Sequence, residues 1–259
     1  MRYPKTMLAT YLTGDPTDRP PLLIVHGLFG SARNWNVIAK RLSDERQVIS
    51  VDMRNHGDSA FQPTHTYPDM AADLAEVIAA HGGQADVLGH SMGGKAAMML
   101  ALTQPGMVRR LVVADIAPVA YGHSQGHLID AMRAVDLSQV GTRRDADDQL
   151  RPLVPEDGVR AFLLQSLDVK GRRWRLNHDI LDRDMGKTTG WPAGVQGQFD
   201  GPVMMLSGAE SDYVQPEHRD TIKAHFPKAR FAKIPGAGHW LHADKPREFE
   251  AAVRAFLNA

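Results

Sequence analysis

The stretch that most constrains the fold is residues 85–102, ADVLGHSMGGKAAMMLAL. Its first residues form an apolar, strand-like run, and its last residues are small or unbranched and favour a helix. Between them, Gly89 and Gly93 flank Ser91 two residues away on either side. Glycines at these positions allow the close backbone approach that a sharp strand-to-helix turn requires. We therefore expect Ser91 in a strained conformation at a helix N-terminus, where free N–H groups stabilise developing negative charge.

Apolar runs alternate with helical patterns along most of the chain, which predicts a parallel sheet with helices on both faces. The expected strands are one or two edge strands around 7–12, then 22–25, 47–51, 85–88, 111–114, 202–206 and 230–234. The expected helices are 32–42, 67–80, the helix that continues from the turn at Ser91 to residue 102, 215–226 and 246–257.

The alternation stops between residues 119 and 199, where amphipathic stretches are separated by proline, glycine and charged residues. No strand-like run is visible there, so we expect a purely helical cap inserted into the sheet. The core domain would then comprise residues 1–118 and 200–259, and the cap residues 119–199.

Composition excludes several classes of function. Lys plus Arg and Asp plus Glu both number 30, so no net charge attracts the chain to nucleic acid or to an anionic membrane. The chain has no cysteine, which excludes disulfides, thiolate catalysis and cysteine–zinc sites. Residues 1–16 lack the apolar core of a signal peptide, and no apolar run is long enough for membrane insertion. We expect a cytoplasmic protein whose partner is a small molecule.

A serine hydroxyl needs a base to take its proton. Among 12 histidines, His239 is the best candidate because it follows the last expected strand on a glycine-rich loop. The chain order of nucleophile, acid and histidine is also kept there. His242 is expected to pack beside the site, while His26 and His90 flank backbone turns and are expected to be structural.

His123 and His127 have the i, i+4 spacing of a metal-binding pair. No third ligand of matching spacing accompanies them, so we expect two surface histidines, no metal and no cofactor.

A tetrahedral intermediate needs two N–H donors for its oxyanion. One is expected from Met92, the residue after Ser91. The other should come from the loop after the 22–25 strand, with Leu28 first and Phe29 second. Candidates for contact with the substrate are Phe29, Ser211 and Trp240.

The blocks LLIVHGLFGSARNW, VDMRNHGDS, VLGHSMGGK, VADIAPV and IPGAGHWLHADKP occur in this order over nearly the whole chain. Together they resemble the α/β-hydrolase superfamily and, more narrowly, the YbfF-like esterases. The resemblance implies a mostly parallel, eight-stranded type of sheet with an inserted helical cap. It also implies a hydrolase of carboxylic esters or acyl thioesters that acts through a Ser-His-Asp triad.

The acidic member of such a triad is ambiguous in the sequence. Most of the superfamily carries the acid after the strand at 202–206, but Ser211 occupies that position here and Asp212 comes one residue late. Asp115, at the end of the strand at 111–114, could also reach a histidine above the sheet. The residues leave both aspartates open; the resemblance to the YbfF-like esterases implies Asp115, with Ser211 as its hydrogen-bonding neighbour.

Other polar groups have a functional and a structural interpretation. Asp52 and Arg54 could act in catalysis, but we expect a structural loop in which Arg54 bonds carbonyls. The arginines at 172, 173 and 175 around Trp174 could bind phosphates, but nearby acidic residues predict an internally paired surface.

The same fold also supports acyltransferases, carbon–carbon bond hydrolases, perhydrolases and ligand receptors. Dehalogenases and epoxide hydrolases need an aspartate where this chain has Ser91.

Overall fold

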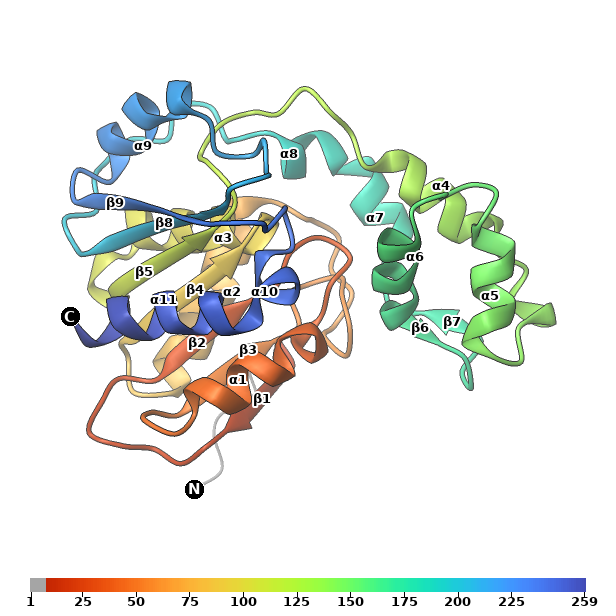
Figure 1. Ribbon diagram of the computed structural model, residues 1–259, viewed down its shortest axis with the longest axis horizontal. Helices are drawn as coiled ribbons and strands as arrows, with labels where there is room; N and C mark the ends of the chain where they lie inside the picture. The colour runs from red at the N-terminus through yellow and green to blue at the C-terminus, as the bar shows by residue number, and fades with distance from the viewer. Residues whose placement is uncertain (1–7) are drawn as a thin grey trace.

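The computed structural model describes residues 8–259, in which seven strands form one sheet in the order β1-β3-β2-β4-β5-β8-β9 (Figure 1). β1 is antiparallel to β3, and the other neighbouring pairs are parallel. The strands are β1 Thr10–Thr13, β2 Leu22–Val25, β3 Val48–Val51, β4 Ala85–His90, β5 Val108–Ala114, β8 Val203–Gly208 and β9 Ala229–Ile234.

The parallel α/β architecture is confirmed, but the expected eight strands are not present in the described residues. A single edge strand, β1, precedes β2, because the chain then turns at Gly14, with φ of +75°, and continues through exposed residues to Arg19. The part of the edge-strand prediction that falls on Met7 lies outside the described residues.

Helices cover both faces of the sheet, and every residue of the central strands β2 and β4 is therefore buried. An apolar layer that includes α2, α3 and α9 covers one face, and another that includes α1 and α11 covers the other. Burial of each large side chain, such as Phe249, contributes roughly 1.5–3 kcal/mol. The helices are α1 Asn36–Leu42, α2 Tyr67–Ala80, α3 Met92–Thr103, α9 Arg219–His225, α10 Leu241–Asp244 and α11 Pro246–Asn258, with single 3₁₀ turns η1 Ala32–Trp35, η2 Pro105–Met107 and η5 Pro216–His218.

The helical segment (residues 119–199) lies beside the edge of the sheet at which the parallel strands end (Figure 1). Its buried side chains, which include Ile129, Leu163 and Leu181, form an apolar cluster that Phe29 of the core joins. Its elements are α4 Gly126–Ala134, η3 Leu137–Gln139, α5 Arg143–Leu150, α6 Asp157–Leu163, η4 Leu164–Ser166, α7 His178–Arg183 and α8 Met185–Thr189.

The prediction that this segment contains no strand is wrong. β6 Leu167–Asp168 pairs antiparallel with β7 Arg173–Trp174. Two-residue strands are too short to leave a period-2 pattern in the sequence. Among the described residues, no helix combines the length and the apolar character that crossing a membrane requires.

Candidate active site

Ser91 lies on the turn between β4 and α3, in the strained backbone expected from its flanking glycines. Its φ is +52° and its ψ is −121°. A side chain at Gly89 would place its Cβ 2.3 Å from the carbonyl oxygen of Gly93, and one at Gly93 would lie 2.4 Å from that of Val25. The strand, the turn and the helix can therefore approach this closely only with glycine at both positions.

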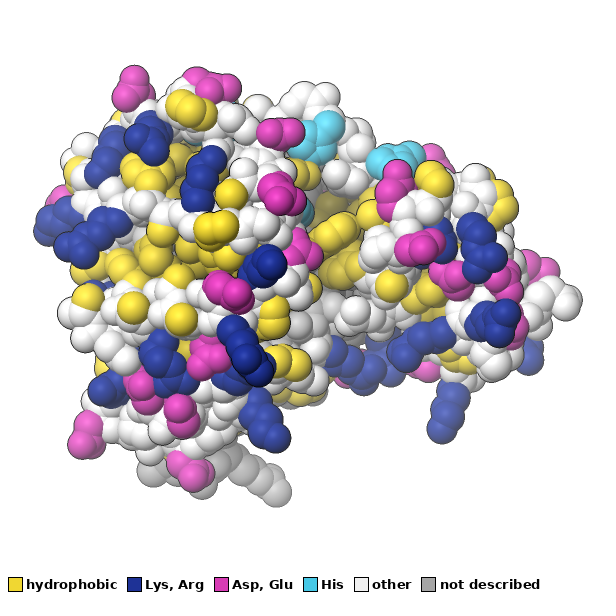
Figure 2. All heavy atoms as spheres, in the orientation of Figure 1, with side chains coloured by type: hydrophobic (Ala, Val, Ile, Leu, Met, Phe, Trp, Pro, Cys, Tyr) yellow, Lys and Arg dark blue, Asp and Glu magenta, His cyan; other side chains and the backbone are white. Residues whose placement is uncertain are grey.

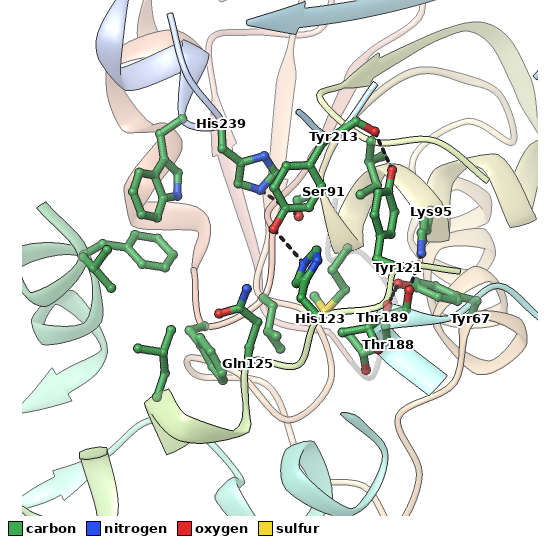
Figure 3. Close-up of a pocket in the computed structure, with 18 residues that line it drawn as sticks. Tyr67, Ser91, Lys95, Tyr121, His123, Gln125, Thr188, Thr189, Tyr213 and His239 are labelled. Atoms are coloured by element: carbon green, nitrogen blue, oxygen red, sulfur yellow. Dashed lines mark hydrogen bonds between the residues drawn. The ribbon is translucent and has the colours of Figure 1, made fainter. Parts of the chain in front are cut away.

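His239 stands between Ser91 and Asp115, on the loop after β9. Its Nε2 lies 3.1 Å from Ser91 Oγ (Figure 3). Its Nδ1 lies 2.7 Å from Asp115 Oδ2. Asp115 is fully buried, whereas the His239 side chain remains 22% exposed. Since a carboxylate only accepts, the Nδ1 proton faces Asp115 and the Nε2 lone pair faces the serine. This tautomer is the one that can take the Ser91 proton.

Asp115, not Asp212, is the aspartate in contact with His239. Asp115 follows β5 with φ of +55°, and its carboxylate also accepts from Gly208 N at 3.0 Å and from Ser211 Oγ at 2.5 Å. Asp212 is exposed and accepts a hydrogen bond from Gln215.

The two expected oxyanion donors border the same site. Met92 is the first residue of α3, so its N–H has no acceptor within the helix. Leu28 is the second residue of a turn closed by a 3.0 Å bond from Gly30 N to Gly27 O. The N–H of Phe29, the second choice, already donates to His56 Nε2 at 3.1 Å.

Tyr213 is a site residue that the sequence analysis did not identify. Its ring stacks on the imidazole of His239, with centroids 4.0 Å apart and planes inclined by 20°. Tyr121 anchors this residue by donating its hydroxyl hydrogen to the Tyr213 carbonyl at 2.7 Å. The sequence shows only an aromatic residue two positions after Ser211, and this spacing by itself does not predict that the ring stacks on His239.

A cavity of about 270 Å³ opens in front of Ser91, between the sheet edge and the helical segment. Figure 2 shows hydrophobic side chains in the hollow between these parts of the molecule. Phe29 and Trp240 line the cavity, as expected of substrate-contacting residues, whereas Ser211 is not among the described residues that line it. The wall from the helical segment includes Leu128, Val159, Phe162 and Thr188.

Lys95 borders the cavity one helical turn beyond Ser91 and is 1% exposed. Its ammonium group donates to the carbonyls of Val119 at 2.7 Å, Thr189 at 3.0 Å and Gly190 at 2.6 Å. These carbonyls lie on the two chain passages that connect the helical segment to the sheet. Burial lowers the pKa of Lys95 to about 7. No sequence motif pointed to this lysine.

The histidines beside the site are buried. The ring of His242 stacks on Trp35 at 4.1 Å, and His90 donates from Nε2 to the His239 carbonyl at 2.8 Å. His26 accepts from Met53 N at 2.9 Å and donates to Gly27 O. Burial lowers the pKa of His26 to about 4 and that of His242 to about 3.

No cluster of three or more potential metal ligands occurs in residues 8–259. His123, of the i, i+4 pair, instead lies 3.0 Å from the Tyr213 hydroxyl.

The loop at 52–58 is held by local hydrogen bonds. Asp52 accepts from the N–H groups of Ala32 and Asp58, each at 2.8 Å. Arg54 pairs with Asp73 and donates to the Thr64 carbonyl. Two of the candidate phosphate-binding arginines are also paired: Arg173 with Asp168 at 3.5 Å and Arg175 with Asp58 at 2.9 Å.

Comparisons with known proteins agree with this fold. A family model described as "alpha/beta hydrolase fold" matches residues 20–246. The sn-1-specific diacylglycerol lipase of Mus musculus is 44% identical over 257 residues, which cover 95% of this chain and 83% of the lipase. Esterase YbfF of Escherichia coli K12 is 42% identical over 247 residues, covering 93% of this chain and 94% of the esterase. Among solved structures, a marine microorganism esterase has a TM-score of 0.91 at 35% identity and covers 97% of this chain and 100% of its own.

These relatives confirm the resemblance seen in the sequence. The family model covers most of the chain, and relatives of more than 40% identity align along nearly its whole length. The chain therefore belongs to the α/β-hydrolase family and stands among relatives that are named esterases and lipases.

Proposed function

We propose that this protein hydrolyses carboxylic esters, or acyl thioesters, through an acyl-enzyme on Ser91. One observation carries the proposal: a continuous hydrogen-bond path from Ser91 through His239 to Asp115, beside a mainly apolar cavity. A serine, a base and an orienting acid in this order form the arrangement that activates a hydroxyl nucleophile. The esterase and lipase names of relatives with more than 40% identity support the same chemistry.

His239 removes the Ser91 proton as Oγ attacks the acyl carbon. The amides of Leu28 and Met92 then stabilise the oxyanion, and the protonated histidine gives its proton to the leaving alcohol or thiol. Asp115 stabilises the imidazolium during this step. Water enters next, loses a proton to His239 and releases the acid, which restores Ser91.

The helical segment, residues 119–199, acts as a cap over the acyl site. Its side chains supply part of an apolar wall, which suits the hydrocarbon portion of an ester. The mouse relative's name makes a diacylglycerol one of the substrates to assay. We propose a small-molecule ester as the partner and no nucleic acid, consistent with the balanced charge.

A direct test combines turnover with active-site labelling. Purified protein should hydrolyse a chromogenic short-chain ester, and Ser91→Ala should lower kcat by at least about 10⁴-fold, as removal of a triad nucleophile does. A fluorophosphonate probe should label Ser91 only. Unchanged turnover in Ser91→Ala, or absence of labelling at Ser91 in active protein, would refute the mechanism. A folded wild-type protein that turns over no ester or thioester, transfers no acyl group and does not react with the probe would instead indicate a ligand receptor.

Acyl transfer to an alcohol is the second candidate function. A Saccharomyces cerevisiae relative named a probable alcohol acetyltransferase is 30% identical and covers 95% of this chain and 79% of its own length. The same acyl-enzyme would then react with an alcohol instead of water. Product analysis with increasing alcohol at constant ester separates the two functions, because a transferase forms new ester in preference to free acid. Perhydrolysis, which needs hydrogen peroxide as the nucleophile, and carbon–carbon bond hydrolysis, which needs a ketone substrate, would each be recognised by their products in a separate assay.

A further inference from the structure

We propose that His56 and Ser166 are positioning residues that hold the backbone of Phe29, His56 at its N–H group and Ser166 at its carbonyl. Because Ser166 belongs to the cap, contact between the cap and the core then fixes the direction of the Leu28 amide in the oxyanion hole. The inference rests on the proposed function, because it assigns the Leu28 amide as an oxyanion donor.

The loop that presents Leu28 contains a backbone conformation that is unfavourable for its residue. The bond from Gly30 N to Gly27 O closes a four-residue turn whose third residue, Phe29, has φ of +63°. A positive φ at this position is typical of a type II turn, where glycine is usual because a Cβ is disfavoured. A phenylalanine stays in this conformation only where its surroundings hold it.

Two buried side chains provide that restraint. The N–H of Phe29 donates to His56 Nε2 at 3.1 Å, and the Ser166 hydroxyl donates to the Phe29 carbonyl at 2.7 Å. Phe29 itself is 2% exposed, and both of its partners are buried. Since neither backbone group can reach water, loss of either partner leaves a buried polar group unpaired.

The tautomer of His56 is fixed by its second hydrogen bond. Its Nδ1 lies 2.9 Å from the carbonyl oxygen of Arg54, which can only accept, so Nδ1 carries the proton. The Nε2 lone pair is therefore free to accept from Phe29. Burial lowers the pKa of His56 to about 3, so the ring remains a neutral acceptor at neutral pH.

His56 belongs to the core and Ser166 to the cap, and one layer of backbone hydrogen bonds joins the two segments. Ser166 O accepts from Arg175 N at 2.8 Å, and Arg175 O accepts from Gly57 N at 2.8 Å. His56 also forms an antiparallel bridge with Leu176.

This layer couples the cap to the turn. A cap that moves away removes Ser166 from the Phe29 carbonyl and breaks the bridge between Leu176 and the backbone of His56. The strained turn then loses its restraint at the Phe29 carbonyl, the strand-like support of His56 is lost, and the Leu28 amide loses its fixed direction. A seated cap restores both contacts, so substrate enclosure and completion of the oxyanion hole occur together.

A purely structural role for these contacts makes a different prediction. If His56 and Ser166 only stabilise the fold, their removal lowers the unfolding temperature and leaves transition-state stabilisation unchanged. Ser59→Ala is a matched control, because Ser59 is also buried and donates to a carbonyl, that of Asp52, without touching Phe29.

The experiment measures kcat, KM and the inhibition constant of a trifluoromethyl ketone, which forms an oxyanion on Ser91. Removal of one oxyanion donor costs about 10²–10³ in kcat, so misdirection of a donor in Ser166→Ala should cost about tenfold. We expect the ketone to bind about tenfold more weakly, with KM changed less than about twofold. His56→Gln, whose amide oxygen can accept, should retain more activity than His56→Leu.

The inference is overturned if Ser166→Ala matches Ser59→Ala in kcat and in ketone affinity, whatever happens to stability. It is also overturned if the loss appears in KM alone. Failure of the proposed function has a separate signature, since Ser91→Ala would then keep wild-type turnover. The kinetics of His56→Leu count only if its circular dichroism spectrum matches that of the wild type. If the spectrum differs, Ser166→Ala alone tests the inference.

Discussion

Ser211 donates its hydroxyl hydrogen to Asp115 at 2.5 Å, onto the same carboxylate oxygen that accepts the Nδ1–H of His239 at 2.7 Å. The residue at the superfamily's usual acid position thus supports a carboxylate that comes from the neighbouring strand. Because Gly208 N donates to the other oxygen at 3.0 Å, both oxygens of this buried group are hydrogen-bonded. Such contacts hold the carboxylate in the direction that His239 needs.

We first predict opposite outcomes for the two candidate acids. Asp115→Asn should lower kcat by about 10⁴, because an amide can donate to His239 and impose the wrong tautomer. Asp212→Asn should change kcat less than about threefold, since an exposed carboxylate without contact to His239 contributes little. Steady-state kinetics on one ester decides between them. The reverse ranking would assign the acid to Asp212.

The stacking of Tyr213 on His239 gives a second prediction. Tyr213→Ala should lower kcat by about threefold to tenfold, because aromatic pairs are worth about 0.5–1.5 kcal/mol. Tyr213→Phe keeps the ring and should remain close to wild type. Equal losses in both variants would show that the hydroxyl group, and not stacking, matters.

Stability should fall in acid because buried histidines are held neutral. Burial lowers the folded-state pKa of His56 and His242 to about 3 and that of His26 to about 4, while an unfolded histidine titrates near 6.5. Between those values the unfolded chain binds more protons than the folded chain. The contribution of these histidines to the free energy of unfolding is therefore fully present above about pH 6.5 and is lost as the pH falls toward 3.

Urea unfolding at pH 7, 6, 5 and 4 measures this loss. Each pKa unit corresponds to about 1.36 kcal/mol, so the histidines together should cost several kcal/mol across this window. A variant that replaces His242 with phenylalanine should show a shallower decline than wild type. A free energy of unfolding that stays constant from pH 7 to 4 would contradict the account.

Lys95 should fix the cap to the core. Lys95→Met keeps much of the buried stem but leaves the carbonyls of Val119, Thr189 and Gly190 without their donor. Unpaired buried groups cost about 1–3 kcal/mol, which should appear as a lower free energy of unfolding in urea. Limited proteolysis should also become faster near residues 119–125. Lys40→Met, at an exposed lysine, is the control and should match wild type in both measurements.

Several features could be predicted from the sequence because local rules determine them. Continuous apolar runs identified β2 and β4, and the glycines around Ser91 identified the turn through sterics alone. The predicted helix at 67–80 agrees with α2 in both bounds. The paired arginines near Trp174 also followed from the acidic residues around them.

Other features depend on contacts between distant segments and could not be found in this way. Asp115 and His239 are 124 residues apart, and the order of β5, β8 and β9 in the sheet brings the loops that carry them together. Tyr213 and Lys95 act through a ring stack and through backbone carbonyls, which leave no motif. The β6–β7 ribbon was missed because each of its strands is only two residues long.

The central claim is that an acyl group passes through Ser91, and rapid-quench mass spectrometry of turnover tests it most directly. Protein mixed with a chromogenic short-chain ester is acidified within milliseconds, and the intact mass and the peptide containing residues 85–102 are measured. The account predicts an added acyl mass on Ser91 that forms with the burst of chromophore and is absent in Ser91→Ala. Full turnover with no acyl group on Ser91 at any time would contradict it.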